Sequence, residues 1–443
     1  MTTLREHEQA VVDAVLPPGP PLPRVIQGLA GVADRRTGLR MLARRYGPDF
    51  TIDVPIFGRV VVISQPDHVR QIFRSAPSEL DTVEGSLSRV MGPNSLFALR
   101  GEVHRAQRKL LTPPFHGHRL RSFAAVVDEE ALREFATWQE HREFATLPSM
   151  MRITLNAILR AVFGAEGSQL LRLQQLLPDA VALGSQLSTM PIPQWNWGRW
   201  SPWGRFLAAR RTYDSIVDEL IASARADPAL GDRTDVLAVL LQSRYDDGSA
   251  MTRDAIADQL VTLLTAGYET TATTLAWTVE RLRRHPELLA RLVAELDDGG
   301  DELLTATIAE VQRCRPVVDI TFRAVTAPSY QLGPWTLPRD QTVLIAIGLV
   351  HDDEALFPDY HRFDPDRFGS AKPDAGAWIP FGGGARRCIG AAFATMELKL
   401  VLRALLRDFT LVPTGERAER RRSRGVASAP ARGGRAIVVR RTR

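Results

Sequence analysis

Cysteine is scarce in this chain of 443 residues, which contains only Cys314 and Cys388. Two cysteines are too few for a disulfide framework or a four-thiolate zinc site, although the sequence leaves one bridge between them open. Long apolar runs are missing as well, because residues 1–16 mix charged side chains with short apolar stretches. We therefore expect a cytoplasmic protein with neither a secretory signal nor a membrane anchor.

Lysine is equally rare and occurs only at positions 109, 372 and 399, so arginine supplies nearly all of the positive charge. The formal net charge is +5, but the arginines are dispersed among 51 acidic residues rather than gathered in a basic arm. This dispersal argues against nucleic-acid binding. A Gly-x-Ser-x-Gly sequence is also absent, so a hydrolase with a serine nucleophile at a strand-to-helix turn has no support.

Apolar periodicity indicates a mainly α protein with α+β character. Residues 17–23 are rich in proline and cannot be helical, so residues 1–23 are predicted to form an extended lead-in to a single domain at 24–443. A hairpin pattern follows at 50–64, and a second β-rich stretch lies at 317–348. Apolar spacing of three and four residues predicts helices at 36–46, 120–136, 150–163, 169–183, 204–224, 234–244 and 390–408. We expect a helical domain with small antiparallel sheets.

The longest predicted helix begins after Thr252, its N-cap, and ends at Pro286. It would be roughly 50 Å long, enough to cross a whole domain. Its middle, residues 266–271 (AGYETT), is poor for helix stability, because glycine lowers the propensity and threonine diverts backbone hydrogen bonds. This weakness predicts a groove, in which Glu269 and Thr270 form an acid–alcohol pair that could transfer protons. A capping or core-polar role is the alternative.

The sharpest local signal is the run from Phe381 to Gly390 (FGGGARRCIG), just before the last predicted helix. A cysteine at a helix N-terminus, with Arg386 two residues before it, lies in a positive potential that favours the thiolate, the form that binds iron. The glycines at 382–384 and 390 allow a flat porphyrin to approach the main chain, and the amides after Cys388 could donate to its sulfur. Cys314 lacks such surroundings and is interpreted as a small buried apolar residue.

This run resembles the heme-ligand loop of the cytochromes P-450 at every defining position, namely Phe381, Gly384, Arg386, Cys388 and Gly390. The resemblance implies that Cys388 is the axial ligand of heme b (iron protoporphyrin IX) and that Arg386 binds a heme propionate. Gly382 and Ile389 would also lie at the heme. The likeness extends over almost the whole chain, especially to soluble mycobacterial members, and implies their single P-450-type fold with a long central I helix.

Two further motifs resemble the family's structural network and its oxygen-activating segment. Glu310 and Arg313 resemble the Glu-x-x-Arg of the K helix, with Arg367 as the third member, although this spacing alone is an ordinary helix ion pair. Residues 266–270 resemble the segment of the I helix that activates oxygen, which implies that Ala266 and Gly267 lie beside the heme and that Glu269 and Thr270 are catalytic.

Three more basic positions are implied to hold the heme. His104 and Arg108 lie one helical turn apart and resemble the C-helix pair that binds a propionate; the alternative is a solvated basic face. Arg323, in the extended run after Pro316, matches another position that binds a propionate.

The resemblance implies a heme-thiolate monooxygenase that activates O2 and hydroxylates or epoxidises an apolar small molecule, such as a lipid, a sterol or a secondary metabolite. Because no flavin domain follows the cysteine loop, electrons are expected from a separate ferredoxin and ferredoxin reductase. The enzyme, expected to be a monomer, would attract an acidic ferredoxin through a cationic surface. The residues expected there are Arg105, Lys109, Arg386, Arg387 and Lys399.

Substrate contacts are expected from a largely apolar set of residues. The candidates are Leu96, Phe97, Ala266, Thr270, Val318 and Ile320. The tryptophan-rich residues 195–203 form either a lid with an apolar lip or a packed interhelical loop. Two other functions stay open: a heme-thiolate peroxygenase or isomerase, which usually alters the acid–alcohol pair, and a heme sensor or carrier without turnover, which does not need it.

Overall fold

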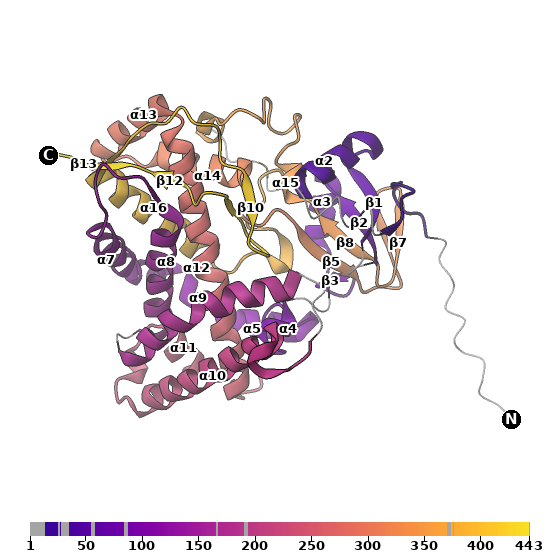
Figure 1. Cartoon of the computed structure of the whole chain (residues 1–443). Helices are drawn as coiled ribbons and strands as arrows, with labels where there is room; N and C mark the ends of the chain where they lie inside the picture. The colour runs from indigo at the N-terminus through magenta and orange to yellow at the C-terminus, as the bar shows by residue number, and fades with distance from the viewer. Residues whose placement is uncertain are drawn as a thin grey trace.

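A large helical region lies beside a smaller β region in the computed structural model, as Figure 1 shows. The described residues are 14–24, 27, 35–54, 58–83, 87–164, 167–189, 194–369, 374 and 376–442. The strands of the β region come from residues 49–81 and 321–345, so segments far apart in the chain lie side by side. This architecture confirms the predicted mainly α fold with small sheets.

One five-stranded sheet forms the centre of the β region. Its order is β1 (Asp49–Val54), β2 (Gly58–Ile63), β8 (Thr342–Ile345), β5 (Thr321–Val325) and β3 (Leu80–Asp81). β1 and β2 pair antiparallel, as the hairpin pattern predicts, and residues 55–57 between them lie outside the described part. β2 and β8 run parallel, because a long crossover of mostly helical chain separates them, so this sheet is mixed.

Both faces of this sheet are covered, because successive side chains of a strand point to opposite sides. Val60 and Val62 pack in one cluster with Leu39 of α2 (Arg35–Tyr46). Val61 and Ile63 pack in another, with the apolar side chains of α3 (Pro66–Arg74). The proline-rich lead-in crosses the edge of the sheet, where the Thr51 amide donates to the Pro18 carbonyl oxygen at 2.9 Å.

Helix α12 (Arg253–Arg283) is 31 residues long and runs through the helical region beside α8 and α14 (Figure 1). Thr252 is its N-cap, as predicted, because the threonine side chain accepts the Ala255 amide at 3.2 Å. The helix stops at Arg283, before the predicted end, because Pro286 disfavours helical backbone in the residue before it and instead begins α13 (Pro286–Asp297). The first half of α12 belongs to one apolar core and the second half to another.

The other helices surround α12. Their bounds are α4 (Ser88–Met91), α5 (Gly101–Leu111), α6 (Gly117–Ser122), α7 (Ala124–Phe135), α8 (Thr146–Phe163), α9 (Ser168–Thr189), α10 (Pro202–Ala226), α11 (Val236–Gln242), α14 (Glu302–Cys314), α15 (Ile347–Val350) and α16 (Ala391–Asp408). The helix predicted at 120–136 is interrupted at Phe123, which separates α6 from α7. No helix in the described part of the chain is both long and apolar enough to cross a membrane.

Short antiparallel pairs complete the fold. They are β6 (Ser329–Leu332) with β7 (Trp335–Pro338), β10 (Arg421–Ser423) with β11 (Ser428–Pro430), β12 (Arg435–Ala436) with β4 (Phe144–Ala145), and β13 (Val438–Arg440) with β9 (Phe409–Leu411). The β10–β11 hairpin lies against α12, because the Trp277 indole N–H donates to the Ser428 carbonyl oxygen at 2.9 Å. The turn of the hairpin lies near the middle of α12, where the Arg424 side chain donates to the Glu269 carboxylate at 2.8 Å.

Candidate active site

Cys388 lies in a tightly folded loop that leads into α16. Its amide donates to the Phe381 carbonyl oxygen (2.9 Å), and the Arg387 amide donates to that of Gly384 (3.0 Å). Gly384 has a φ of +65°, and a Cβ at this position would overlap the backbone of Phe73 in α3. Only glycine suits this conformation and this contact, so the loop is held against α3 before α16 begins.

Two other glycines of the loop have open surroundings. A Cβ at Gly382 or at Gly390 would meet no heavy atom within 4 Å. Cys388 is itself exposed. The thiol and both glycines therefore border open space, and a flat group could lie directly against the main chain there. Cys388 and Cys314 are both free, so the bridge that the sequence left open is not formed; Cys314 is partly exposed at the end of α14 rather than buried.

Packing around the sulfur raises the pKa of the Cys388 thiol, even though the residue is exposed on its open side. The Gly390 amide and the guanidinium groups of Arg108 and Arg387 act in the opposite direction and lower this pKa. The cations that act on the sulfur are thus Arg108 and Arg387, rather than Arg386 as the sequence predicted. Because the net shift of the Cys388 pKa is upward, the loop by itself does not favour the thiolate, contrary to the expectation from the sequence.

Arg386 bonds to Asp81 at the end of β3. Its Nε donates to the Asp81 carboxylate (3.0 Å), a terminal nitrogen pairs with the same oxygen, and further N–H groups donate to the carbonyl oxygens of Leu96 (2.9 Å) and Leu99 (2.7 Å). Burial opposes ionisation of Asp81, but the Gly101 amide and Arg386 lower its pKa overall. Arg386 therefore fastens the cysteine loop to the segment before α5.

His104 of α5 is buried among the other predicted basic residues. Burial and the positive charges of Arg386 and Arg108 lower the pKa of His104 to about 4, with Arg323 adding to the effect and Asp81 opposing it. The ring is therefore neutral at pH 7. The structure thus brings together His104, Arg108, Arg323 and Arg386, four positions from three separate segments.

Arg323 of β5 is a buried cation, because the residue is only 7% exposed. Its guanidinium donates to the Phe322 carbonyl oxygen at 2.8 Å and lies 6.0 Å from the centre of the Phe73 ring. Among the described residues, no carboxylate lies within ion-pairing distance of it. Burial and the positive charge of Arg386 lower the pKa of Arg323 to about 10. A buried guanidinium without an acid partner is suited to bind an anion.

The middle of α12 has one accessible face. Ala266 is exposed and Thr270, four residues later on the same face, is partly exposed, whereas residues 271–283 are buried. The Thr270 hydroxyl donates to the Ala266 carbonyl oxygen at 2.9 Å, and the segment stays helical throughout. Gly267 faces Ile158, which a Cβ would approach to 3.1 Å. This glycine therefore allows α8 to pack closely on α12.

Glu269 is buried beside this face and pairs with Arg424, whose Nε lies 2.8 Å from the glutamate Oε1. Arg424 lies in the turn between β10 and β11. The Ser185 hydroxyl of α9 donates to the Arg424 carbonyl oxygen (3.0 Å) and accepts the Val426 amide (3.1 Å). Three elements thus meet at Glu269, although no hydrogen bond joins Glu269 to the Thr270 side chain among the described residues.

The predicted network of Glu310, Arg313 and Arg367 is assembled in the core. Arg313 donates twice to the Glu310 carboxylate, each bond 2.7 Å long, and both side chains are fully buried. Arg367 reaches the same carboxylate at 3.4 Å. Arg313 also donates to the His351 carbonyl oxygen (2.9 Å), and the His351 ring accepts the Ile379 amide (3.0 Å) just before the cysteine loop. The network is therefore connected to the loop that holds Cys388.

Comparison with known proteins decides the family. The cytochrome P-450 family profile matches residues 17–433. This chain belongs to the cytochrome P-450 family. It is 53% identical over 426 residues to cytochrome P-450 138 of Mycobacterium tuberculosis, a match that covers 96% of this chain and 97% of that protein. It is 40% identical over 440 residues to cytochrome P-450 135B1 of the same species, covering 97% and 92%.

Solved structures show the same fold. The retinoic-acid-bound cyanobacterial CYP120A1 matches with a TM-score of 0.84 at 24% identity, over 97% of this chain and 100% of that chain. The cytochrome P-450DA heme domain matches with a TM-score of 0.85 at 21% identity, over 97% and 98%. The chain is thus a P-450 monooxygenase, and its family implies a heme cofactor.

The residues of this P-450 fit a heme. Cys388 offers a sulfur donor, and the open surroundings of Gly382 and Gly390 leave room for a flat ring. The buried Arg323, which has no carboxylate partner among the described residues, and the neutral His104 suit the anionic edge of a porphyrin. No cluster of His, Cys, Asp and Glu side chains that could hold a metal ion occurs in the part of the chain that the structure describes.

An open hollow of about 600 Å³ lies beside Cys388 along α16. Its lining includes Arg387, Lys399 and Arg403, but Asp301 pairs with Lys399 (3.2 Å) and with Arg403 (3.3 Å). Elsewhere on the expected cationic surface, Glu102 pairs with Arg105 and Asp246 pairs with Lys109. Arg386 does not belong to this surface, because its side chain is only 12% exposed and pairs with Asp81.

The expected substrate positions differ in accessibility. Leu96, Val318 and Ile320 are partly exposed, and Phe97 is exposed. Ile320 packs in part against the β core, so it has less surface to offer a substrate. The tryptophan-rich segment is not a packed loop throughout, because Trp195, Trp197 and Trp200 are exposed whereas Trp203 packs with Phe206.

Three residues near the site were not predicted from the sequence. Asp81 lies in a two-residue strand and Arg424 in a short turn, and neither position carries a pattern that points to its partner. Glu397 is fully buried in α16 with no hydrogen-bond partner of good geometry in the described residues. The sequence does indicate that Glu397 is buried, because it follows Phe393 and precedes Val401 at four-residue spacing on the apolar face of α16.

Proposed function

We propose that this P-450 is a heme-thiolate monooxygenase in which Cys388 binds the iron of heme b. The observation that carries the proposal is an exposed cysteine flanked by Gly382 and Gly390, both open to a flat ring. Gly390 offers a backbone amide to the sulfur, and Ile389 lies between them in the chain. When bound, the heme supplies the redox centre at which dioxygen is reduced.

Arg323, His104 and Arg108 would hold the heme propionates. Arg323 is the most suitable, because its buried charge has no carboxylate partner among the described residues. His104 is neutral and can donate one hydrogen bond. Arg386 would contribute less than the resemblance implies, because Asp81, Leu96 and Leu99 occupy most of its N–H groups.

Glu269 and Thr270 would move protons to the substrate side of the heme. Thr270 offers its hydroxyl on the accessible face of α12, and Glu269 lies next to it in the chain. The Arg424 side chain is 37% exposed, so its pair with Glu269 links the buried acid to solvent. This acid–alcohol pair supports monooxygenation over peroxygenase or isomerase chemistry.

The substrate would be an apolar small molecule such as a lipid, a sterol or a secondary metabolite, which is hydroxylated or epoxidised. The accessible residues Leu96, Phe97, Ala266 and Val318 support this class, because none of them offers a charged or hydrogen-bonding side chain. We expect the enzyme to act as a cytoplasmic monomer.

Electrons would come from a separate ferredoxin and ferredoxin reductase. The hollow beside Cys388, with Arg387, Lys399 and Arg403 in its lining, supports docking of an acidic protein. Because Asp301 neutralises part of this charge, reduction should slow moderately as salt rises. A reduction rate that is independent of salt would contradict electrostatic docking.

The test of the central proposal is the optical spectrum of the reduced protein with carbon monoxide. The wild type should show the strongly red-shifted Soret band of a thiolate-bound heme. Cys388→Ser should lose this band, and Cys314→Ser, the matched control, should keep it. A red-shifted band in Cys388→Ser, or heme bound through nitrogen in the wild type, would overturn the proposal.

A further inference from the structure

Three tryptophans stand in solvent between α9 and α10. Trp195, Trp197 and Trp200 are 59%, 64% and 78% exposed. The rings of Trp195 and Trp197 are stacked with their centres 5.2 Å apart, and the Arg199 guanidinium lies 4.6 Å from the centre of the Trp200 ring. Together they expose on the order of 400 Å² of aromatic surface, about the size of the largest apolar patch on a typical monomer, and such patches are often functional.

The segment that carries these rings has a defined backbone. The Ser201 hydroxyl accepts the amides of Trp197 (3.0 Å) and Gly204 (3.1 Å), which joins the segment to the start of α10. Gly198 has a φ of +56°, and a Cβ at Gly204 would overlap its backbone. Hydrogen bonds therefore fix the backbone from Trp197 to Gly204.

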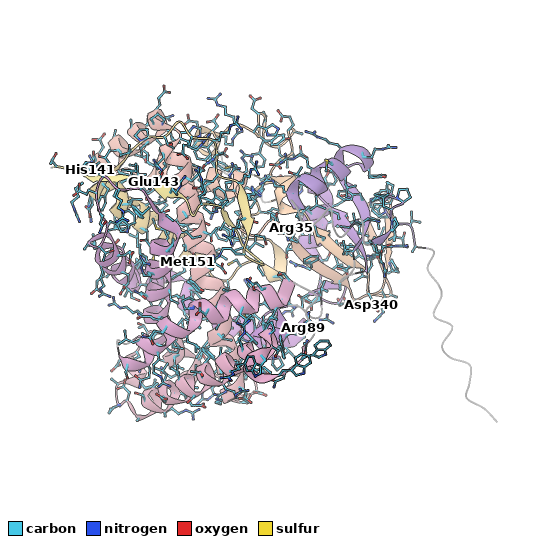
Figure 2. The ribbon with its side chains drawn as sticks, viewed as in Figure 1. Arg35, Arg89, His141, Glu143, Met151 and Asp340 are labelled. Carbon is cyan, nitrogen blue, oxygen red and sulfur yellow. The ribbon has the colours of Figure 1, made fainter. Side chains whose placement is uncertain are left out.

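Apolar contacts below the segment fix it to the helical region. Trp203 and Phe206 pack with Val90 and Met91 of α4 and with Leu187 of α9. Figure 2 shows side chains that project outward from the loop before α10, near the labelled Arg89 of α4. We call the segment with these three exposed tryptophans, above the packed Trp203 and Phe206, the tip.

The chain that carries the tip is basic. The chain contains no Asp or Glu between Asp179 and Asp214, whereas it has four arginines there. Arg199, Arg205 and Arg211 are exposed, and in the described part of the chain none of them has a carboxylate within ion-pairing distance. Arg210 is the exception, because it pairs with Asp214 and Asp258.

We propose that residues 195–211 form a docking surface for the interface of an anionic phospholipid bilayer. Tryptophan is the side chain that prefers the boundary between acyl chains and headgroups, and exposed arginines attract anionic lipids. A protein partner is less suited to this tip, because the exposed aromatic area is about half of what one side of a stable protein interface buries. The surface would bring the enzyme to the place where apolar molecules collect, and it does not depend on the heme proposal.

The test is sedimentation of the full-length holoprotein with vesicles of two compositions. Equimolar phosphatidylcholine and phosphatidylglycerol should bind the wild type at least about tenfold more tightly than phosphatidylcholine alone, and added salt should reduce the difference. Replacing Trp195, Trp197 and Trp200 together by Ser should weaken binding to the anionic vesicles by about tenfold or more. Leu171→Ser, which alters a 59% exposed apolar side chain on α9, is the matched control and should bind normally.

The charge is tested separately. Replacing Arg199, Arg205 and Arg211 by Gln should remove the preference for anionic vesicles. The same change at the exposed Arg417, Arg420 and Arg422 should leave the preference intact. Wild-type heme absorption and circular dichroism show that each variant is folded. The inference is wrong if the wild type does not bind anionic vesicles, if the tryptophan variant binds them equally well, or if the tryptophans instead hold two copies of the chain together in sedimentation equilibrium.

Discussion

The core network of this P-450 makes a quantitative prediction for Glu310→Gln. The Glu310 carboxylate accepts two N–H groups of Arg313 and the Asp364 amide (3.0 Å), and it lies 3.4 Å from Arg367. Glutamine keeps the volume but removes the charge, so the fully buried Arg313 loses its counterion. Breaking a buried pair in this way costs about 3–5 kcal/mol, a large part of the roughly 5–15 kcal/mol that stabilises a protein.

The assay is urea unfolding of the holoprotein, followed by circular dichroism and by heme absorbance. Glu310→Gln should unfold at lower urea and release heme first, because Arg313 is connected through His351 to Ile379 and the cysteine loop. Glu102→Gln is the matched control, since Glu102 and Arg105 are also three residues apart on a helix but are 79% and 67% exposed. It should cost less than about 1 kcal/mol. Equal losses in the two variants would refute the reasoning.

Three further outcomes are expected. Burial raises the pKa of Glu397 well above 4.5, so the folded protein keeps a proton that the unfolded chain releases. The free energy of unfolding should therefore fall as the pH rises above 4.5, by up to about 1.4 kcal/mol per pH unit. Urea unfolding at several pH values should show a smaller fall in Glu397→Gln, and an unchanged slope would contradict the assignment. Thr270→Ala should consume electrons with less product. Thr262→Ala is the control, because it also loses a hydroxyl bond to the carbonyl oxygen four residues earlier, and it should keep the wild-type yield of product per electron. Arg424→Gln should lower the yield of product per electron, because Glu269 loses its cation, whereas Arg424→Lys should retain most of the wild-type yield. If the two variants give the same yield, the ion pair has no role in coupling.

Local patterns predicted most elements of this fold because each depends on short-range chemistry. The N-cap of α12 follows from the Thr252 side chain, and α16 follows from its apolar spacing. The ends were less certain, since α12 stops before Pro286 and Phe123 divides one predicted helix into two. Pro286 ends α12 through its effect on the residue before it, whereas no periodic signal marks the division at Phe123.

For the site, the sequence by itself determined that Cys388 lies among glycines before a helix, and that an acid and an alcohol lie at the middle of the longest helix. Only the tertiary structure decided which charges meet. Arg386 pairs with Asp81 and Glu269 with Arg424, from positions 305 and 155 residues away in the chain. A buried charge takes whichever partner the fold brings within bonding distance, and such pairings leave no periodic trace in the sequence.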